Sequence, residues 1–139
     1  MNEPELIAEM LETAKTIAVV GISNKPERAS YHVAAEMQRR GYRIVPVNPV
    51  LKEVLGELCY PSLREIPFPV DLVDVFRAPE FVPQVVEDVL AIGLKYLWLQ
   101  EGVVHPEAIA RAEAAGLRVV ADRCIYKEHV RWRAEHAGR

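Results

Sequence analysis

The chain carries the run Thr16-Ile17-Ala18-Val19-Val20, followed directly by Gly21-Ile22-Ser23-Asn24-Lys25-Pro26-Glu27-Arg28-Ala29-Ser30. The first run is apolar and β-branched, as expected for a strand that is covered on both faces. Gly21 permits a sharp backbone turn where that strand ends. A helical pattern then runs from Arg28 to Arg40 and stops at Gly41. The segment therefore predicts a buried strand, a tight turn and a helix.

The same alternation of strands and helices continues along the chain. Apolar runs predict strands at 16–20, 42–47, 70–76, 95–99 and 117–121, and helical spacing predicts helices at 5–15, 28–40, 79–92, 106–115 and 125–136. Such alternation is typical of a parallel sheet with right-handed crossovers. We therefore predict an α/β fold, a doubly wound and mostly parallel five-stranded sheet with helices on both faces. We expect the third strand at one edge, followed by the second, first, fourth and fifth.

Length and composition indicate one domain over residues 1–139. The chain has 139 residues, of which 50% are hydrophobic and 27% are charged. The net charge of −3 argues against a general binder of nucleic acid or anionic membranes, which needs a basic face. A run of roughly 18 apolar residues is absent, and the first helix is too charged for a signal peptide. We expect a cytoplasmic protein, and its cysteines, Cys59 and Cys124, form no Cys-x-x-Cys pair of the kind that indicates a zinc site.

The loop after the first strand combines several features of an anion site. In a doubly wound sheet, ligands bind beyond the carboxyl ends of the strands. Here Gly21 allows close backbone approach, a helix N-terminus follows, and Lys25 and Arg28 add positive charge. This combination suits a phosphate or pyrophosphate. The same residues also fit a plain strand-to-helix turn with a polar cap and two solvated cations. Further small donors in the loop are Ser23, Asn24 and Ser30.

The motifs of two common nucleotide-binding classes are incomplete. The phosphate loop Gly-x-x-x-x-Gly-Lys-Ser/Thr is absent, which disfavours nucleoside-triphosphate hydrolases of that type. The fingerprint Gly-x-Gly-x-x-Gly is also absent, since Ser23 and Pro26 stand at its second and third glycine positions. The run Pro46–Pro49 after the second strand lacks the acidic residue that usually holds the ribose of a nicotinamide cofactor. A NAD site is therefore disfavoured, and Asn48 fits either a ribose contact or a turn before a proline.

Five segments, one at each predicted strand end, match a known family in order. These segments are Val20–Tyr31, Val45–Pro49, Val70–Arg77, Trp98–Gly102 and Asp122–Cys124. With them the chain resembles the small stand-alone CoA-binding proteins, which are similar to the N-terminal CoA-binding Rossmann domain of the succinyl-CoA synthetase alpha subunit. The resemblance covers the chain from about residue 10 to residue 130.

The resemblance implies a role for each segment. The first loop would hold the phosphates of coenzyme A, and the segment after the second strand, with Lys52 nearby, would line the adenosine side. The segment after the third strand would pack along the nucleotide. A Glu-Gly pair and a cysteine also match the synthetase, although Ala121–Cys124 replaces its Gly-Pro-Asn-Cys run. The binding residues implied in this way are Gly21, Ile22, Ser23, Asn24, Lys25, Arg28, Ser30, Asn48, Pro49, Phe76, Arg77, Ala78, Glu101, Gly102 and Cys124.

The sequence contains no complete catalytic constellation. None of its four histidines has a cysteine or aspartate partner at nucleophile–base spacing, and His105, next to Pro106, predicts a helix cap. Cys124 fits either a reactive thiol at a helix N-terminus or a small half-buried residue. The remaining expectations are structural: Asp71 and Asp74 at solvent or sheet edges, Glu87-Asp88 and the stretch 127–133 on solvated helix faces, and Trp98 and Trp132 as packing residues.

We therefore expect a non-catalytic module that binds coenzyme A or an acyl-CoA through its phosphorylated ADP part, with no metal, nucleic-acid or membrane partner. Two alternatives stay open. One is a small enzyme that uses an NAD-type dinucleotide or a CoA-linked reaction at Cys124. The other is a regulatory subunit whose pocket is vestigial. A protein partner or a homodimer fits any of the three.

Overall fold

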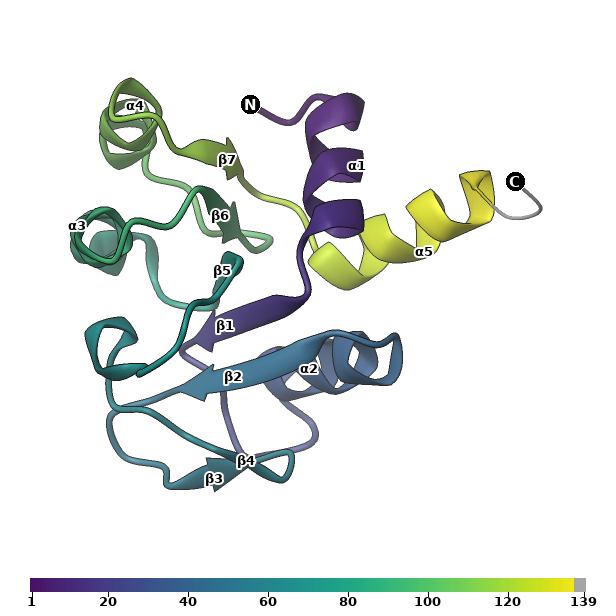
Figure 1. Ribbon diagram of the computed structural model, residues 1–139, viewed down its shortest axis with the longest axis vertical. Coiled ribbons are helices and arrows are strands. Elements are labelled where there is room, and N and C mark those ends of the chain that lie inside the picture. Colours follow the sequence, from purple (N-terminus) through teal and green to yellow (C-terminus); the bar gives the residue numbers. More distant parts are fainter. Residues whose placement is uncertain (137–139) are drawn as a thin grey trace.

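The computed structural model describes residues 1–136 and confirms the α/β class (Figure 1). Every predicted helix and strand is present, and most boundaries agree within two residues. In chain order the elements are α1 (Pro4–Thr13), β1 (Thr16–Val20), α2 (Ala29–Arg39), β2 (Arg43–Val47), β3 (Glu53–Val54), β4 (Glu57–Leu58), the 3-10 turn η1 (Leu63–Glu65), β5 (Leu72–Val75), the 3-10 turn η2 (Pro79–Phe81), α3 (Val82–Ala91), β6 (Tyr96–Leu99), α4 (Pro106–Ala114), β7 (Arg118–Val120) and α5 (Ile125–Glu135).

The central sheet has five parallel strands in the order β2-β1-β5-β6-β7. The predicted strand order was wrong, because β5 lies in the middle of the sheet and β2 lies at its edge. Pro46 explains the difference. It has no N–H for a second ladder, so it is confined to edge strands, and its carbonyl accepts the Tyr60 N–H (3.0 Å) on the outer side of β2. All four β5 residues are buried, as a central strand requires.

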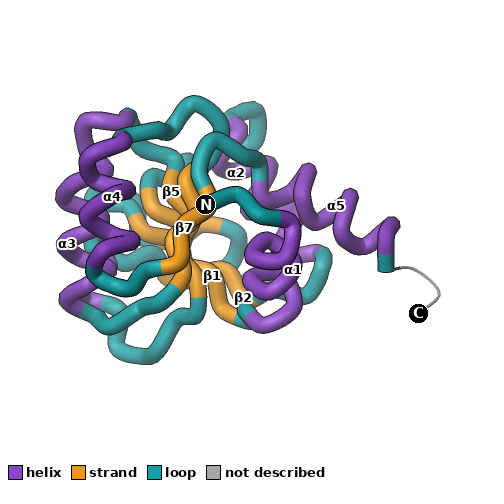
Figure 2. Tube along the Cα trace, turned by 90° about the horizontal axis from the view of Figure 1, so that it is seen from above, coloured by secondary structure: helices purple, strands orange, loops and turns teal. Residues whose placement is uncertain are grey.

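Two helical layers cover the sheet, as predicted. Helices α3 and α4 pack on one face, and α1, α2 and α5 pack on the other (Figures 1 and 2). The face under α3 and α4 is an apolar cluster that includes Val73, Val86 and Leu97. The opposite face contains Ile17, Met37 and Trp98. Because the helices leave the ends of the strands open, the carboxyl edge of the sheet is free for a ligand.

Two local features were not predicted. A short hairpin, β3–β4, turns through Leu55 and Gly56, which both have positive φ (56° and 76°). Such turns usually carry Asn-Gly or Asp-Gly, so Leu-Gly gave no recognisable signal. The predicted helix 79–92 is also divided into η2 and α3. The predicted cap at α4 is confirmed, since Nδ1 of His105 accepts the Ala108 N–H at 3.0 Å.

The two aspartates near β5 have opposite environments. Asp71 lies at the start of the strand as expected, and its carboxylate accepts the N–H groups of Lys15 and Thr16, both at 2.9 Å. Asp74 contradicts the expectation, because it is only 1% exposed and its Oδ1 has no hydrogen-bond partner within the described residues. It shares a face with its register neighbours Val19 and Trp98. Burial raises the pKa of Asp74 well above its ordinary value.

The stretch 127–133 was predicted to form a solvated helix face, and this prediction was wrong for two of its residues. Glu128 and His129 are buried, whereas the other five residues are exposed or partly exposed. Nδ1 of His129 lies 3.2 Å from the Arg40 guanidinium, and its ring meets Tyr42 edge-on. Burial, reinforced by nearby arginines, lowers the pKa of His129 to about 4. The polar burial follows from the position of α5, whose N-terminal half packs between α1 and α2.

No helix among residues 1–136 has both the length and the apolar character needed to cross a bilayer.

Replacing Asp74 with asparagine is expected to stabilise the fold at neutral pH. Burial raises the pKa of Asp74 in the folded protein, whereas in the unfolded chain this carboxyl has a pKa of about 3.9. Above that pH, ionisation lowers the free energy of the unfolded chain more than that of the folded protein, which destabilises the fold. Asparagine does not ionise and so removes this cost. The free energy of unfolding should therefore rise at pH 7, and the gain should shrink as the pH falls toward 4. Urea denaturation measures this. As the matched control, Asp71→Ala should destabilise the fold, because the N–H groups of Lys15 and Thr16 lose their acceptor. An Asp74→Asn variant that is less stable than the wild type at pH 7 would contradict the prediction.

Mild acid is expected to destabilise the protein through His129. Its folded-state pKa is depressed, so its contribution to stability is complete above pH 6.5 and is lost as the pH falls toward 4. The slope should approach ~1.4 kcal/mol per pH unit between these limits. Urea denaturation at pH 7, 6 and 5 should show this slope in the wild type and a smaller one in His129→Gln. The exposed His32→Gln variant should keep the wild-type slope, and equal slopes in all three proteins would refute the assignment.

Candidate functional site

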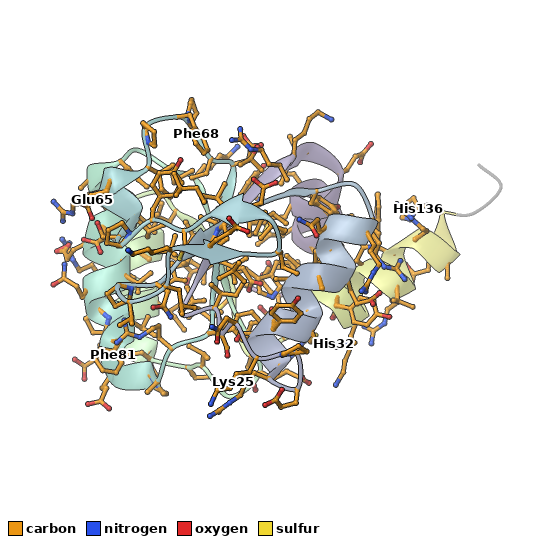
Figure 3. The ribbon with its side chains drawn as sticks, turned by 90° about the horizontal axis from the view of Figure 1, so that it is seen from below. Lys25, His32, Glu65, Phe68, Phe81 and His136 are labelled. Carbon is orange, nitrogen blue, oxygen red and sulfur yellow. The ribbon has the colours of Figure 1, made fainter. Side chains whose placement is uncertain are left out.

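The carboxyl ends of the five parallel strands lie at one end of the molecule. Lys25, from the loop after β1, and Phe81, from η2 after β5, both lie at that end in Figure 3. Phe68, which precedes β5, lies at the opposite end. Three neighbouring hollows open along this carboxyl edge, and they contain nearly all of the predicted site residues.

Gly21 stands at the crossing point between the first loop and β5. Its φ is +85°, and a Cβ built on it would lie 2.4 Å from the Phe76 carbonyl oxygen and 3.0 Å from Cδ of Arg77. Its N–H donates to the Val47 carbonyl at 3.0 Å. Both the backbone conformation and the lack of space therefore require glycine. The sheet order reverses here, since β1 leads to α2 on one face and β5 leads to α3 on the other.

The first loop is held in shape by its own serines. Oγ of the buried Ser30 accepts the Ser23 N–H at 2.9 Å, and Oγ of Ser23 accepts the Lys25 N–H at 3.0 Å. Each hydroxyl still has its hydrogen to donate to a ligand. Ile22 contributes only backbone to the surface, because its side chain is fully buried in the core. The two serine hydroxyls therefore hold the loop in shape by accepting backbone N–H groups, and each can also donate a hydrogen bond to a ligand.

The N-terminus of α2 has the features of an anion-binding site. The first N–H groups of a helix have no partner within the helix, and no side chain caps α2 at Arg28. The side chains of Lys25 and Arg28 are exposed, and neither forms an ion pair within residues 1–136. A helix dipole and two unpaired cations therefore face the same space. This space, the loop hollow, measures about 540 Å³ and is lined by Gly21, Ile22, Ser23, Asn24, Lys25, Arg28, Ala29, Ser30, Asn48, Val50, Leu51 and Phe76.

Asn48 joins the first loop to the second. Its Nδ2 donates to the Ile22 carbonyl at 2.9 Å, and its Oδ1 accepts the N–H groups of Val50 (2.8 Å) and Leu51 (3.2 Å). The side chain is half-buried and most of its hydrogen-bonding capacity is used inside the protein. Of the two roles that the sequence allowed, the structure shows the turn, extended by a bond between the loops.

A second space, the α3 hollow, lies on the other side of the crossing point. It measures about 490 Å³ and combines residues after β2 and β5 with residues of η1 and α3. The Arg77 guanidinium stacks 3.9 Å from the centre of the Phe81 ring and has no ion-pair partner within the described part of the chain. The hollow is lined by Val20, Gly21, Val47, Asn48, Pro49, Val50, Pro61, Ser62, Leu63, Phe76, Arg77, Ala78, Phe81, Gln84, Val85 and Asp88.

A third space, the α5 hollow, measures about 300 Å³ and lies between the start of α2, the segments after β5 and β6, and the residue that precedes α5. Cys124 is buried there at the N-cap of α5, and Oε1 of Gln100 accepts the N–H of Ile125 at 3.1 Å. Glu101 at its edge pairs with Lys127 at 3.2 Å. Within residues 1–136 no hydrogen bond joins Cys124 to a base. The hollow is lined by Ala29, Val33, Phe76, Arg77, Gln100, Glu101, Val103 and Cys124.

The structure gathers every predicted site residue except Gly102 into the three hollows. The N–H of Gly102 instead donates to Oδ1 of Asp122 at 2.8 Å, which ties two loops together. Lys52 is exposed and lines none of the three hollows. Sequence reasoning missed the wall of the α3 hollow that η1 and α3 supply, because its residues lie on an ordinary amphipathic helix with no motif. No group of three or more potential metal ligands occurs among the described residues.

Comparison with known proteins agrees with this geometry. A family model described as "CoA binding domain" matches residues 15–130, which include all three hollows. The protein YneT of Bacillus subtilis is 43% identical over 123 residues, which cover 88% of this chain and 91% of YneT. A solved structure of a protein from Pyrococcus horikoshii OT3 is 42% identical, with a TM-score of 0.90, and the match covers 94% of this chain and 92% of that one.

A longer relative places the same domain inside an enzyme. The ADP-forming acetate–CoA ligase I of Archaeoglobus fulgidus is 28% identical over 127 residues. The match covers 84% of this chain but only 18% of the ligase. The chain therefore corresponds to a small part of that enzyme, whereas it matches YneT over nearly its whole length.

Replacing Asn48 with alanine is expected to loosen the second loop. The substitution leaves one carbonyl and two N–H groups without their partner, which should lower the free energy of unfolding by ~1–3 kcal/mol. Hydrogen exchange should accelerate at the amides of Val50 and Leu51. Asn24→Ala is the matched control, because Asn24 is exposed and no hydrogen bond involves its side chain in residues 1–136. Unchanged exchange at both amides in Asn48→Ala would disprove the bracing role.

Proposed function

The chain belongs to the family of CoA-binding domains, and on that premise we propose that it binds coenzyme A, or an acyl-CoA, through the phosphorylated ADP part and without catalysing a reaction. One observation carries the proposal. The uncapped start of α2 and the unpaired cations Lys25 and Arg28 open on one hollow, and Gly21 lets a ligand approach the backbone there.

The charges of the site suit a ligand with several phosphates. Lys25, Arg28 and Arg77 line neighbouring hollows and have no acidic partner among residues 1–136, while most of the other arginines are paired. Charge-assisted hydrogen bonds to phosphate are about twice as strong as neutral ones. A chain with a net charge of −3 thus keeps a local cluster of free cations at the place where the fold receives anions.

The arrangement of the hollows suits the remainder of the ligand. In nucleotide-binding sheets of this kind the pyrophosphate lies at the first loop and the ribose near the end of the second strand. The loop hollow would accordingly hold the phosphates. The α3 hollow shares Asn48 and Val50 with the loop hollow and adds Pro49 and residues after β5, and it would hold the adenosine. Asn48 supports this arrangement by fixing the distance between the two loops.

Binding without catalysis is the part of the proposal that concerns this chain rather than its longer relatives. The ligase of Archaeoglobus fulgidus matches this chain over only 18% of its length, so most of that enzyme lies outside the match. In the described residues Cys124 has no hydrogen-bonded base, and the buried His129 lies under α1 and α2 rather than in any of the three hollows. These observations favour a sensor, carrier or partner subunit.

The Arg28→Ala variant tests the site by titration calorimetry with coenzyme A. The loss of one charge-assisted contact should weaken binding by ~1.5–3 kcal/mol, a factor of about 10 to 150. Higher salt should narrow the difference, because the contact is exposed. Arg39→Ala is the matched control, since Arg39 lies at the far end of the same helix, and it should bind like the wild type.

The outcomes separate the three functions that the sequence allows. Unchanged affinity in Arg28→Ala would remove Arg28 from the site. If the wild-type protein does not bind coenzyme A but NAD raises its free energy of unfolding, a dinucleotide enzyme would be supported. Wild-type protein that binds neither, and that co-purifies with a stable protein partner, would support a regulatory subunit. Native mass spectrometry of the purified protein gives an independent answer from the small molecule that it retains.

A further inference from the structure

We infer that a second copy of this chain docks in the groove between α1 and α5, and that each copy inserts the projecting half of its α5 into the groove of the other. The groove lies apart from the three hollows and shares no lining residue with them. The inference does not depend on coenzyme A, and its test uses the protein without a ligand.

Helix α5 extends beyond the body of the molecule. Its first half packs between α1 and α2, whereas its second half stands away from the other helices and strands (Figures 1 and 2). His136 marks the far end of this half in Figure 3. Val130 and Ala134, one helical turn apart, are both exposed there. Because most helical stability in proteins comes from packing, a projecting helix end of this kind is suited to packing against another chain.

The angle between α1 and the second half of α5 contains a groove of about 460 Å³. Both helices contribute apolar side chains to it, Ile7 and Ala8 from α1 and Trp132 from α5. Both also contribute charged side chains, among them Glu5 and Glu135. Apolar and aromatic groups surrounded by polar ones are the usual composition of a protein–protein interface.

The two helices that form the groove carry opposite charge. Every ionisable side chain of α1 is a glutamate, and Glu5 and Glu12 form no ion pair within residues 1–136. Helix α5 carries the cations Lys127, Arg131 and Arg133, and Arg133 has no ion-pair partner in the same part of the chain. Arg133 is exposed and does not line the groove of its own chain. An unpaired acid at the groove and an unpaired cation on the projecting helix therefore complement each other between two chains.

A twofold axis lets both copies use these features at once, since in such an interface each contact occurs twice. The helices then stack in the order α1, second-copy α5, α5 and second-copy α1. With about 3.6 residues per turn, Trp132 and Glu135 lie on one side of α5, and Val130, Arg133 and Ala134 lie toward the other. The first side faces the α5 of the second copy. The other side faces its α1, which covers Val130 and brings Arg133 to Glu5.

Sedimentation equilibrium of the full chain without ligand tests the inference. The wild type should form a dimer whose fraction rises with protein concentration. Glu5→Arg and Arg133→Glu should each weaken the dimer by at least about tenfold, because each variant places two like-charged pairs in the symmetric interface. An equimolar mixture of the two variants should form dimers again, because both contacts then join opposite charges.

Glu113→Arg is the matched control. It makes the same change of charge at an exposed glutamate of α4 that forms no ion pair in residues 1–136, and it should dimerise like the wild type. Hydrogen exchange of the wild type gives a second measurement that no substitution can disturb. Amides in α1 and in the second half of α5 should exchange more slowly as the protein concentration rises, and those of α4 should not change.

Four results would overturn the inference. They are a wild type that stays monomeric at every concentration, a dimer that both charge reversals leave unchanged, a mixture of two folded variants that stays monomeric, and slower exchange confined to elements other than α1 and α5. None of these results bears on the proposed binding of coenzyme A, because the groove and the hollows have no residue in common.

Discussion

The close contact between Gly21 and the Phe76 carbonyl is the constraint on which the rest of the site depends. A Cβ at residue 21 would lie 2.4 Å from that oxygen, so the loop after β1 can cross the end of β5 only without a side chain. This crossing lies where the helices of neighbouring strands depart to opposite faces of the sheet. Because of it, the loop hollow and the α3 hollow share Gly21, Asn48, Val50 and Phe76 and lie next to each other.

The polar side chains near this crossing fall into two groups, those that brace the loops and those that stay unpaired. The side chains of Ser30, Ser23 and Asn48 form hydrogen bonds within and between the loops. These bonds hold the loops in shape in the absence of a ligand. The side chains of Lys25 and Arg28 form no hydrogen bond or ion pair within the described residues. Preorganised loops reduce the entropy lost on binding, and free cations avoid the cost of breaking existing ion pairs. Affinity for an anion therefore draws on both groups, and each can be altered without removing the other.

The sequence allowed the fold class and most element boundaries to be predicted, because periodicity and glycine at helix ends are local signals. The strand order could not be read as reliably, although Pro46 was a usable sign that 42–47 is an edge strand. The burial of Asp74 had no local sign, since it depends on β5 being central. Gly21 and Arg28 were found because their loop follows a strand, whereas Gln84 reaches the site only through the packing of α3 beside η1.

The ionisable groups of the interior and those of the carboxyl edge have opposite environments. Asp74 and His129 are buried, and burial shifts the pKa of each toward the value that keeps it neutral at pH 7. The side chains of Lys25 and Arg28 at the carboxyl edge are exposed to water, where their mutual repulsion is screened. A bound polyphosphate would exclude that water and strengthen each contact. Burial thus disfavours the charged forms of Asp74 and His129 in the interior, while Lys25, Arg28 and Arg77 stay without acidic partners among residues 1–136 at the carboxyl edge.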